Sequence, residues 1–475
     1  MTSVAIVLAV GIAATLATFL FVTRRRSQSP TVAFFHPFWY GFNTYIPIHL
    51  SRPPQRNSLT IAQSDGGGGG ERVLWAAVSA LLARESKSAI KFNVVIYSKT
   101  GLSLDTVLQK VKSQFGIVFS KDQKSRISFV ELTYWRYLEA ERYPRLTLVA
   151  QSIASAFVAA EALIKHPPPE IFVDTIGFAF TLPIAKLLGC RKVLAYVHYP
   201  TISSDMINVV KDGVESYNNR GRVATSPFVR NLKLCYYRLF AMLYSFVGSY
   251  ADVILANSSW TIAHLNSIWK LESRSKVVFP PCETKSLTDF SLKNRERVIL
   301  SVAQFSGPKK LRLLFIGGAR HAADKALADS VLEYATRLGI RGNVDILVNA
   351  PFPDLQAWLG KASLGLHAMR DEHFGIGIVE YMAAGVIPIA NNSGGPKMDI
   401  VSTSNRESRT GYLASSKEEY AAAIWDALNL SADEEFDMRT RARSSVATRF
   451  STATFQTEFL RSIDPLMDGA FSKRR

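Results

Sequence analysis

The chain contains little cysteine for its length. Its 475 residues include only three cysteines, which lie far apart in the sequence: Cys190, Cys235 and Cys282. Thiols so few and so scattered exclude a disulfide framework and a zinc site of the usual spacing. They favour reduced, buried side chains in a reducing compartment.

Acidic residues are also scarce relative to basic ones. The chain has 39 Asp and Glu against 56 Lys and Arg, a net charge of +17. Three kinds of partner could explain this positive charge: nucleic acid, an anionic lipid surface and phosphate-rich substrates. Because no zinc-finger, helix-turn-helix or RNP-like motif occurs, nucleic acid ranks last and is not expected as a partner. We expect a membrane surface and diphosphate substrates instead.

One long run without charge occurs at the N-terminus. Val4–Val22 has no charged residue and is followed at once by Arg24–Arg26. As a helix it spans about 28 Å, close to the hydrocarbon thickness of a bilayer. The basic residues follow the run, whereas a signal peptide carries them before it. The pattern predicts a single-pass anchor with the body of the protein in the cytosol; a cleaved signal peptide is the alternative.

A second apolar stretch, Leu232–Val247, is too short and too interrupted for a spanning helix. It contains Lys233, Arg238 and five aromatic residues. Two interpretations stay open, a helix at the membrane surface and a core helix of the N-terminal domain.

Short apolar runs alternate with helical patterns along most of the chain. Without apolar–polar alternation, such runs are typical of parallel strands covered on both faces. The expected strands form two sets: Val32–His36, Phe92–Tyr97, Ile171–Asp174, Val193–His198, Val253–Asn257 and Val277–Phe279, then Val298–Ala303, Leu311–Gly317, Val344–Val348, Leu364–Ala368 and Val386–Ala390. The pattern predicts an α/β protein with two doubly wound domains and a ligand cleft between them. A final helical stretch runs from about Ala432 to Asp464.

Residues 372–400 are the most informative segment. Glu372 and Glu380 are separated by seven residues, and glycines lie between them in a loop. An apolar helical run follows to Gly385, then a buried strand and a second glycine pair, Gly394–Gly395. Two strand-to-helix turns would thus meet at one sheet edge, which suits a phosphate or sugar ligand. An ordinary α/β unit with loop glycines explains the same pattern.

Other motifs, in order along the chain, resemble those of retaining GT-B glycosyltransferases. They are Gly66–Trp75, Phe172–Asp174, Tyr196–Ser203, Asn257–Thr261, Pro280–Cys282 and Ser301–Phe305. Together with residues 372–400 they resemble the GDP-mannose-dependent α-1,2-mannosyltransferases that extend the dolichol-linked oligosaccharide for protein N-glycosylation. The resemblance covers roughly residues 31–37 and 65–460.

This resemblance implies the function and the partners. It implies transfer of α-1,2-linked mannose from GDP-mannose to a dolichyl-diphosphate trimannosyl oligosaccharide at the endoplasmic reticulum membrane. Other mannosyltransferases of the pathway are expected partners, and neither a metal nor another cofactor is expected. The expected division is an anchor at 1–30, an acceptor domain at 31–285, a nucleotide-sugar domain at 286–445 and a helix at 446–475 that returns to the acceptor domain.

The resemblance also implies roles for particular residues. His198 and Glu372 are expected in catalysis, at the acceptor hydroxyl or donor sugar and at the mannose hydroxyls. Glu380 is expected on the nucleotide ribose. The remaining expected donor contacts surround the diphosphate: Gly69, Gly70, Lys309, Lys310, Phe374, Gly375 and Ile376.

Two segments depart from the family. Only seven residues separate Val298–Ala303 from Leu311–Gly317, so a helix is missing near residue 306, and with it a basic turn that Lys309 and Lys310 replace only in part. Phe38–Ser64 is an atypical insertion without Asp or Glu. We therefore expect apolar surface left uncovered on the second sheet.

The departures leave two alternatives to an active transferase. One is a catalytically defective relative that serves as a binding subunit of a glycosylation complex. The other is a dehydrogenase using Gly66–Gly70, which is disfavoured because Lys91–Ser98 lacks the acid that such a fold requires.

Overall fold

The computed structural model describes most of the chain after residue 29. The described residues are 30–37, 69–84, 92–99, 102–143, 145–212, 227–282, 284–301, 312–317, 322–350, 352–405 and 407–471. The expected anchor Val4–Val22, the insertion Phe38–Ser64 and both Lys309 and Lys310 lie outside them.

The N-terminal half forms a seven-stranded parallel sheet in the order β3-β2-β1-β4-β5-β6-β7. Its strands are β1 Thr31–Phe35, β2 Asn93–Ser98, β3 Ile127–Glu131, β4 Ile171–Asp174, β5 Lys192–Val197, β6 Val253–Ala256 and β7 Ser275–Val277. The inner strands are buried along almost their whole length, as their continuous apolar sequences require. Edge strand β3 was not predicted, since its exposed and half-buried residues break the apolar run.

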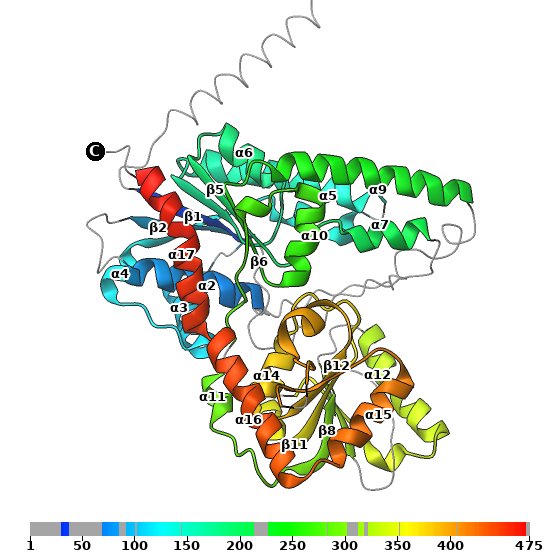
Figure 1. Cartoon of the computed structure of the whole chain (residues 1–475). Helices are drawn as coiled ribbons and strands as arrows, with labels where there is room; N and C mark the ends of the chain where they lie inside the picture. Colours follow the sequence, from blue (N-terminus) through cyan, green and yellow to red (C-terminus); the bar gives the residue numbers. More distant parts are fainter. Residues whose placement is uncertain are drawn as a thin grey trace, which may run out of the picture.

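Helices cover both faces of this sheet (Figure 1). One face packs against α2 Gly69–Arg84, α3 Leu104–Phe115 and α17 Thr452–Phe471. The other packs against α5 Thr147–Lys165, α6 Thr181–Leu187, α9 Pro227–Gly248 and α10 Ser259–Trp269. Shorter elements are α4 Lys121–Ser125, η2 Trp135–Leu138, η3 Ala140–Arg142, α7 Ser204–Lys211, η4 Glu272–Arg274 and α11 Lys285–Thr288.

The C-terminal half forms a six-stranded parallel sheet in the order β10-β9-β8-β11-β12-β13. Its strands are β8 Glu296–Ser301, β9 Arg312–Gly317, β10 Val344–Val348, β11 Ala362–His367, β12 Ile387–Asn391 and β13 Tyr412–Ala414. The helices are α12 Ala322–Arg337, η5 Arg341–Asn343, α13 Phe352–Lys361, α14 Ile376–Ala384, the π-helix η6 Pro396–Ile400, α15 Lys417–Leu428 and α16 Ala432–Arg449.

Strands β8 and β9 are parallel neighbours, although only residues 302–311 join them. The expectation of uncovered apolar surface is wrong for these strands. Val298, Ile299 and Leu300 are buried, and so are all four central residues of β9. Their side chains belong to two cores on opposite faces of the sheet. The described helices therefore cover both strands.

The expected terminal helix is two helices with a break at Phe450 and Ser451. Figure 1 shows α16 beside the lower sheet and α17 continuing along the upper one. Phe455, Phe459 and Ile463 of α17 join the N-terminal core. This last helix therefore packs on the first sheet.

One described helix, α5, is long and apolar enough to cross a membrane. Nearly half of its apolar window, 44%, is buried inside the protein. Its own residues Val158, Ala159 and Leu163 are part of the N-terminal core. A core helix accounts for these contacts, so α5 is weak evidence of a spanning segment.

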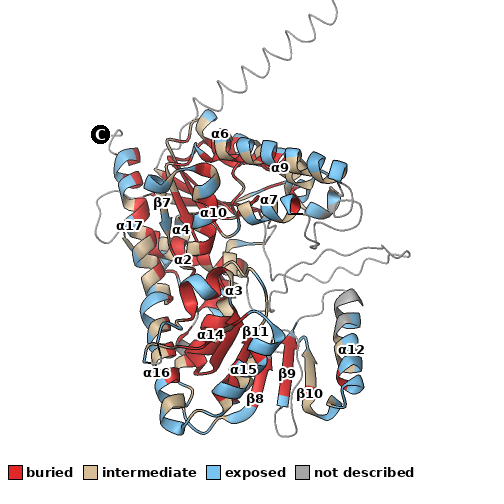
Figure 2. Cartoon of the chain, turned by 45° about the vertical axis from the view of Figure 1, so that its right-hand side comes forward, coloured by how far each residue is buried: buried red, intermediate tan, exposed pale blue. Residues whose placement is uncertain are grey.

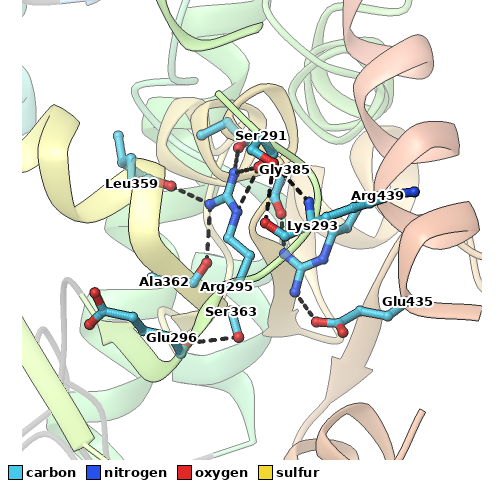
Figure 3. Close-up of polar contacts among 11 residues, drawn as sticks. Ser291, Lys293, Arg295, Glu296, Leu359, Ala362, Ser363, Gly385, Glu435 and Arg439 are labelled. Atoms are coloured by element: carbon cyan, nitrogen blue, oxygen red, sulfur yellow. Dashed lines mark hydrogen bonds and ion pairs between the residues drawn. The ribbon is translucent and has the colours of Figure 1, made fainter. Parts of the chain in front are cut away.

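Three arginines fix the carboxyl end of α14, the helix that follows Glu372. Figure 3 shows Arg295 and Arg439 converging on this end. Arg295 donates to the carbonyl of Ala384 and, at 2.5 Å, to that of Leu359 in α13. Arg439 donates to the carbonyl of Gly385, and Arg443 to that of Ala383 at 2.8 Å. Carbonyls at a helix end have no partner within the helix, so these guanidinium groups satisfy them and balance the helix dipole.

Candidate active site

Two histidines stand at the carboxyl ends of β1 and β5. The buried His36 follows β1, and its Nδ1 lies 2.8 Å from Oγ1 of Thr175, which follows β4. His198 follows β5, and its ring lies 5.0 Å from that of Tyr196. Because the carboxyl ends of parallel strands share one edge, three strands bring these polar groups together.

The environment of His198 holds its imidazole neutral. Burial, and then the neighbouring His373, lowers the pKa of His198 to about 4. Its buried Nε2 has no hydrogen-bond partner among the described residues. A neutral imidazole with one unused nitrogen can accept or donate a hydrogen bond to a hydroxyl of a ligand.

The glycines that begin α2 lie directly against this histidine and against the second sheet domain. A Cβ at Gly70 would lie 3.6 Å from Nε2 of His198, and one at Gly69 only 2.7 Å from Cδ1 of Ile376. Any side chain at Gly69 would therefore push Ile376 away. The sequence predicted both positions as donor contacts, and the structure brings both to the meeting point of the two halves.

Glu372 lies in the loop after β11, held by its own backbone and by the second glycine pair. Its Oε1 accepts from the N–H of His373 at 3.1 Å, and its carbonyl accepts from Gly395 at 2.8 Å. A Cβ at Gly394, where φ is +59°, would lie 2.2 Å from that carbonyl oxygen. Only glycine suits that position, since φ and space both exclude a side chain. Burial raises the pKa of Glu372.

Helix α14 begins at the end of this loop with its N–H groups uncapped by any described side chain. Gly375, its N-cap residue, has a φ of 109° and no side chain to offer. Phe374 before it is buried, and Glu380 lies one turn into the helix. Burial raises the pKa of Glu380, and Arg72 of α2 opposes this shift. Glu372 and Glu380 thus flank one helix N-terminus that faces α2.

The sequence did not single out His367. This residue ends β11, and its Nε2 lies 3.6 Å from Oε2 of Glu372. Burial lowers the pKa of His367 to about 4, so the imidazole is neutral beside the carboxylate. A lone polar residue closing an apolar strand is the same signal that drew attention to His198.

Comparisons with known proteins agree with this architecture. A family model described as "ALG11 mannosyltransferase N-terminus" matches residues 61–269, and one for "Glycosyl transferases group 1" matches residues 289–445. Relatives named GDP-Man:Man(3)GlcNAc(2)-PP-Dol alpha-1,2-mannosyltransferase share 42% identity in Xenopus tropicalis and 37% in Homo sapiens. The matches cover 85% of both chains for the first, and 86% of this chain and 88% of the relative for the second. The chain belongs to this mannosyltransferase family. It is therefore a glycosyltransferase.

Solved structures show the same fold at low identity. A sucrose-phosphate synthase from Thermosynechococcus elongatus superposes with a TM-score of 0.59 at 14% identity, over 93% of this chain and all of the other. HepE from Anabaena, solved with UDP-glucose, gives 0.54 at 14% identity over 92% and 99%. Both domains therefore have the GT-B arrangement that the sequence predicted.

No group of three or more His, Cys, Asp or Glu side chains within the described ranges is placed to hold a metal ion.

Proposed function

We propose that this chain transfers mannose from GDP-mannose to the trimannosyl oligosaccharide on dolichyl diphosphate, in α-1,2 linkage. The observation that carries the proposal is the meeting of His198 and Gly70 with the Glu372 loop, in a chain of the mannosyltransferase family. GDP-mannose is an α-glycosyl diphosphate, so an α-linked product requires retention of configuration.

In this proposal the second sheet domain holds the donor. Glu372 accepts hydrogen bonds from mannose hydroxyls and keeps the anomeric carbon within reach of the acceptor. Glu380 accepts from the ribose. The backbone of Phe374, Gly375 and Ile376 directs N–H groups toward the diphosphate, where the helix dipole favours negative charge.

Departure of the diphosphate is the step that the site must assist. Uncapped N–H groups of α14 lie opposite the first turn of α2 at Gly69 and Gly70, so two helix N-termini can stabilise the developing charge without a metal. Lys309 and Lys310 would add cationic charge. His198 approaches from the acceptor side and hydrogen-bonds the incoming hydroxyl or the sugar.

The proposed location is the cytosolic face of the endoplasmic reticulum membrane, and an apolar face on α9 supports contact with a lipid surface. Helix α9 buries Tyr237, Phe240 and Tyr244 and leaves other apolar side chains exposed. The exposed ones are Phe228, Leu232, Leu239, Met242, Leu243 and Phe246. Figure 2 shows this exposed outer side. One side of Leu232–Val247 therefore belongs to the core, and the exposed apolar side supports the proposed contact with a membrane.

Transfer of radiolabelled mannose tests the proposal. The purified full-length chain is given GDP-[¹⁴C]mannose and Man3GlcNAc2 on dolichyl diphosphate, and the lipid-linked product is digested with an α-1,2-mannosidase. We expect label in the lipid-linked product, and we expect the mannosidase to release that label as free mannose. Binding of GDP-mannose without any transfer would instead favour the binding-subunit alternative.

A further inference from the structure

In the loop that carries Glu372, the side chain of His373 packs against two aromatic rings of the first domain. The ring of His373 lies 4.3 Å from the ring of Tyr199 and 5.1 Å from that of Trp260, measured between centroids. Tyr199 directly follows His198, and His373 directly follows Glu372. The two expected catalytic residues are therefore linked through their immediate chain neighbours.

The first-domain side of this contact is rigidly built. Trp260 is 8% exposed and lies in the first turn of α10, 4.2 Å from the ring of His264. His264 in turn has Oγ of Ser204 at 2.7 Å from Nδ1 and a carboxylate oxygen of Asp205 at 3.2 Å from Nε2. These bonds join α10 to α7, so Trp260 offers His373 a fixed surface.

A second contact reaches the same helix end from the second domain. Oδ2 of Asp399, in η6, accepts the N–H of Ser259 at 2.8 Å. An anion at a helix N-terminus is favourable because it meets free N–H groups and the positive end of the dipole. His373 and Asp399 of the second domain thus contact two adjacent residues of α10, Trp260 and Ser259.

We propose that His373 is a positioning residue, wedged between Tyr199 and Trp260, that sets the register of the two domains for mannose transfer. This inference rests on the proposed function. With the wedge in place, Glu372 on one domain and His198 on the other address the same donor sugar. Without it, each domain keeps its own ligand contacts, but the reacting groups are no longer aligned.

The expected kinetic signature follows from where each ligand binds. Most of the expected donor contacts belong to the second domain, so His373→Ala should leave the KM for GDP-mannose within about threefold. Misalignment of reacting groups by about 1 Å should lower kcat about 10- to 100-fold. His373→Phe keeps an aromatic ring at the wedge and should recover most of the wild-type kcat.

A double-mutant cycle tests the wedge directly. His373→Ala, Tyr199→Ala and the double variant are compared by kcat, KM and melting temperature, with Trp425→Ala as a control because that exposed ring belongs to α15 alone. The double variant is expected to be no slower than the slower single variant by more than about twofold, because both remove one contact. Melting temperatures should stay close to that of the wild type.

Three results would overturn the inference. They are additive losses of kcat, a His373→Phe variant as slow as His373→Ala, or a loss confined to the KM for GDP-mannose. Absence of transfer by the wild-type chain would refute the proposed function instead, so the two failures are distinguishable.

Discussion

The two ends of α14 differ in whether side chains satisfy their free backbone groups. At the carboxyl end, Arg295, Arg439 and Arg443 donate to successive carbonyls. At the amino end stands Gly375, and no described side chain caps the N–H groups there. Because a helix is stiff, fixing the carboxyl end also fixes the direction of the N–H groups at the amino end. The comparison indicates that the carboxyl end is satisfied by arginine side chains, whereas the N–H groups of the amino end are left for the proposed ligand.

The largest expected effect lies at the amino end. Glu372→Gln keeps the shape of the side chain but removes the charge that orients sugar hydroxyls. We expect transfer to fall about 1000-fold in kcat/KM, through lost positioning and electrostatic stabilisation. The melting temperature should not fall, because burial already raises the pKa of this carboxyl. Initial rates and thermal melts measure the two quantities, and near-normal turnover would remove Glu372 from the site.

The next effect lies at the carboxyl end and should be one of stability. Arg439 is fully buried, and Arg439→Met leaves the carbonyl of Gly385 without this donor. Loss of a buried charged donor should lower the free energy of unfolding by about 2–4 kcal/mol. Turnover of the folded enzyme at low temperature should change little.

Arg461→Met is the matched control for this end. Arg461 is 65% exposed and pairs with Glu458 on α17. An exposed pair of this kind contributes at most about 1 kcal/mol. Equal destabilisation by both substitutions, measured by urea unfolding, would contradict a special role for the arginines at α14.

The surroundings of the two ends also differ in their response to acid. Guanidinium groups stay charged, whereas burial lowers the pKa of His36 to about 3 and of His198 and His367 to about 4. Between pH 6.5 and 4 the unfolded chain binds protons at these positions and the folded chain does not. These histidines therefore lower stability as the pH falls, and Asp174, whose pKa burial raises to about 6, offsets one of them.

His367→Gln removes the contribution of one of these histidines, because glutamine does not bind a proton in this pH range. The variant should reduce the pH dependence of the unfolding free energy by at most about 1.4 kcal/mol per pH unit within that window. Urea unfolding at pH 7.5, 6.0 and 5.0 measures the slope for both proteins. Parallel slopes would show that His367 titrates normally in the folded state.

Much of the fold was predictable because apolar runs determine buried parallel strands. Ile171–Asp174 and Val344–Val348 were predicted with their observed limits. The unpredicted strands, β3 and β13, lie at sheet edges, where one side lacks a neighbouring strand and the sequence needs fewer apolar residues. The break between α16 and α17 was missed because both flanking segments have helical patterns.

Candidate site residues could be proposed from the sequence where a glycine marks a turn or a polar residue ends an apolar strand. Gly394 shows what the sequence does not predict. The glycine pair indicates a turn, but only the structure shows how closely the backbone at Gly394 approaches Glu372. His373 resembles any loop histidine, and its partners Tyr199 and Trp260 lie more than a hundred residues away. Contacts between domains leave no periodicity in a sequence, so pattern alone does not reveal them.

The smallest expected effect probes the open space at the amino end. Gly377 lies in the first turn of α14, and a Cβ there would meet nothing within 4 Å. Gly377→Ala should raise the free energy of unfolding by about 0.5–1 kcal/mol, because alanine loses less conformational freedom in a helix. The added methyl group should also weaken GDP-mannose binding a few-fold, since it narrows the space beside the N–H groups. Urea unfolding and titration calorimetry separate the two effects, and higher stability with unchanged affinity would place the diphosphate away from this turn.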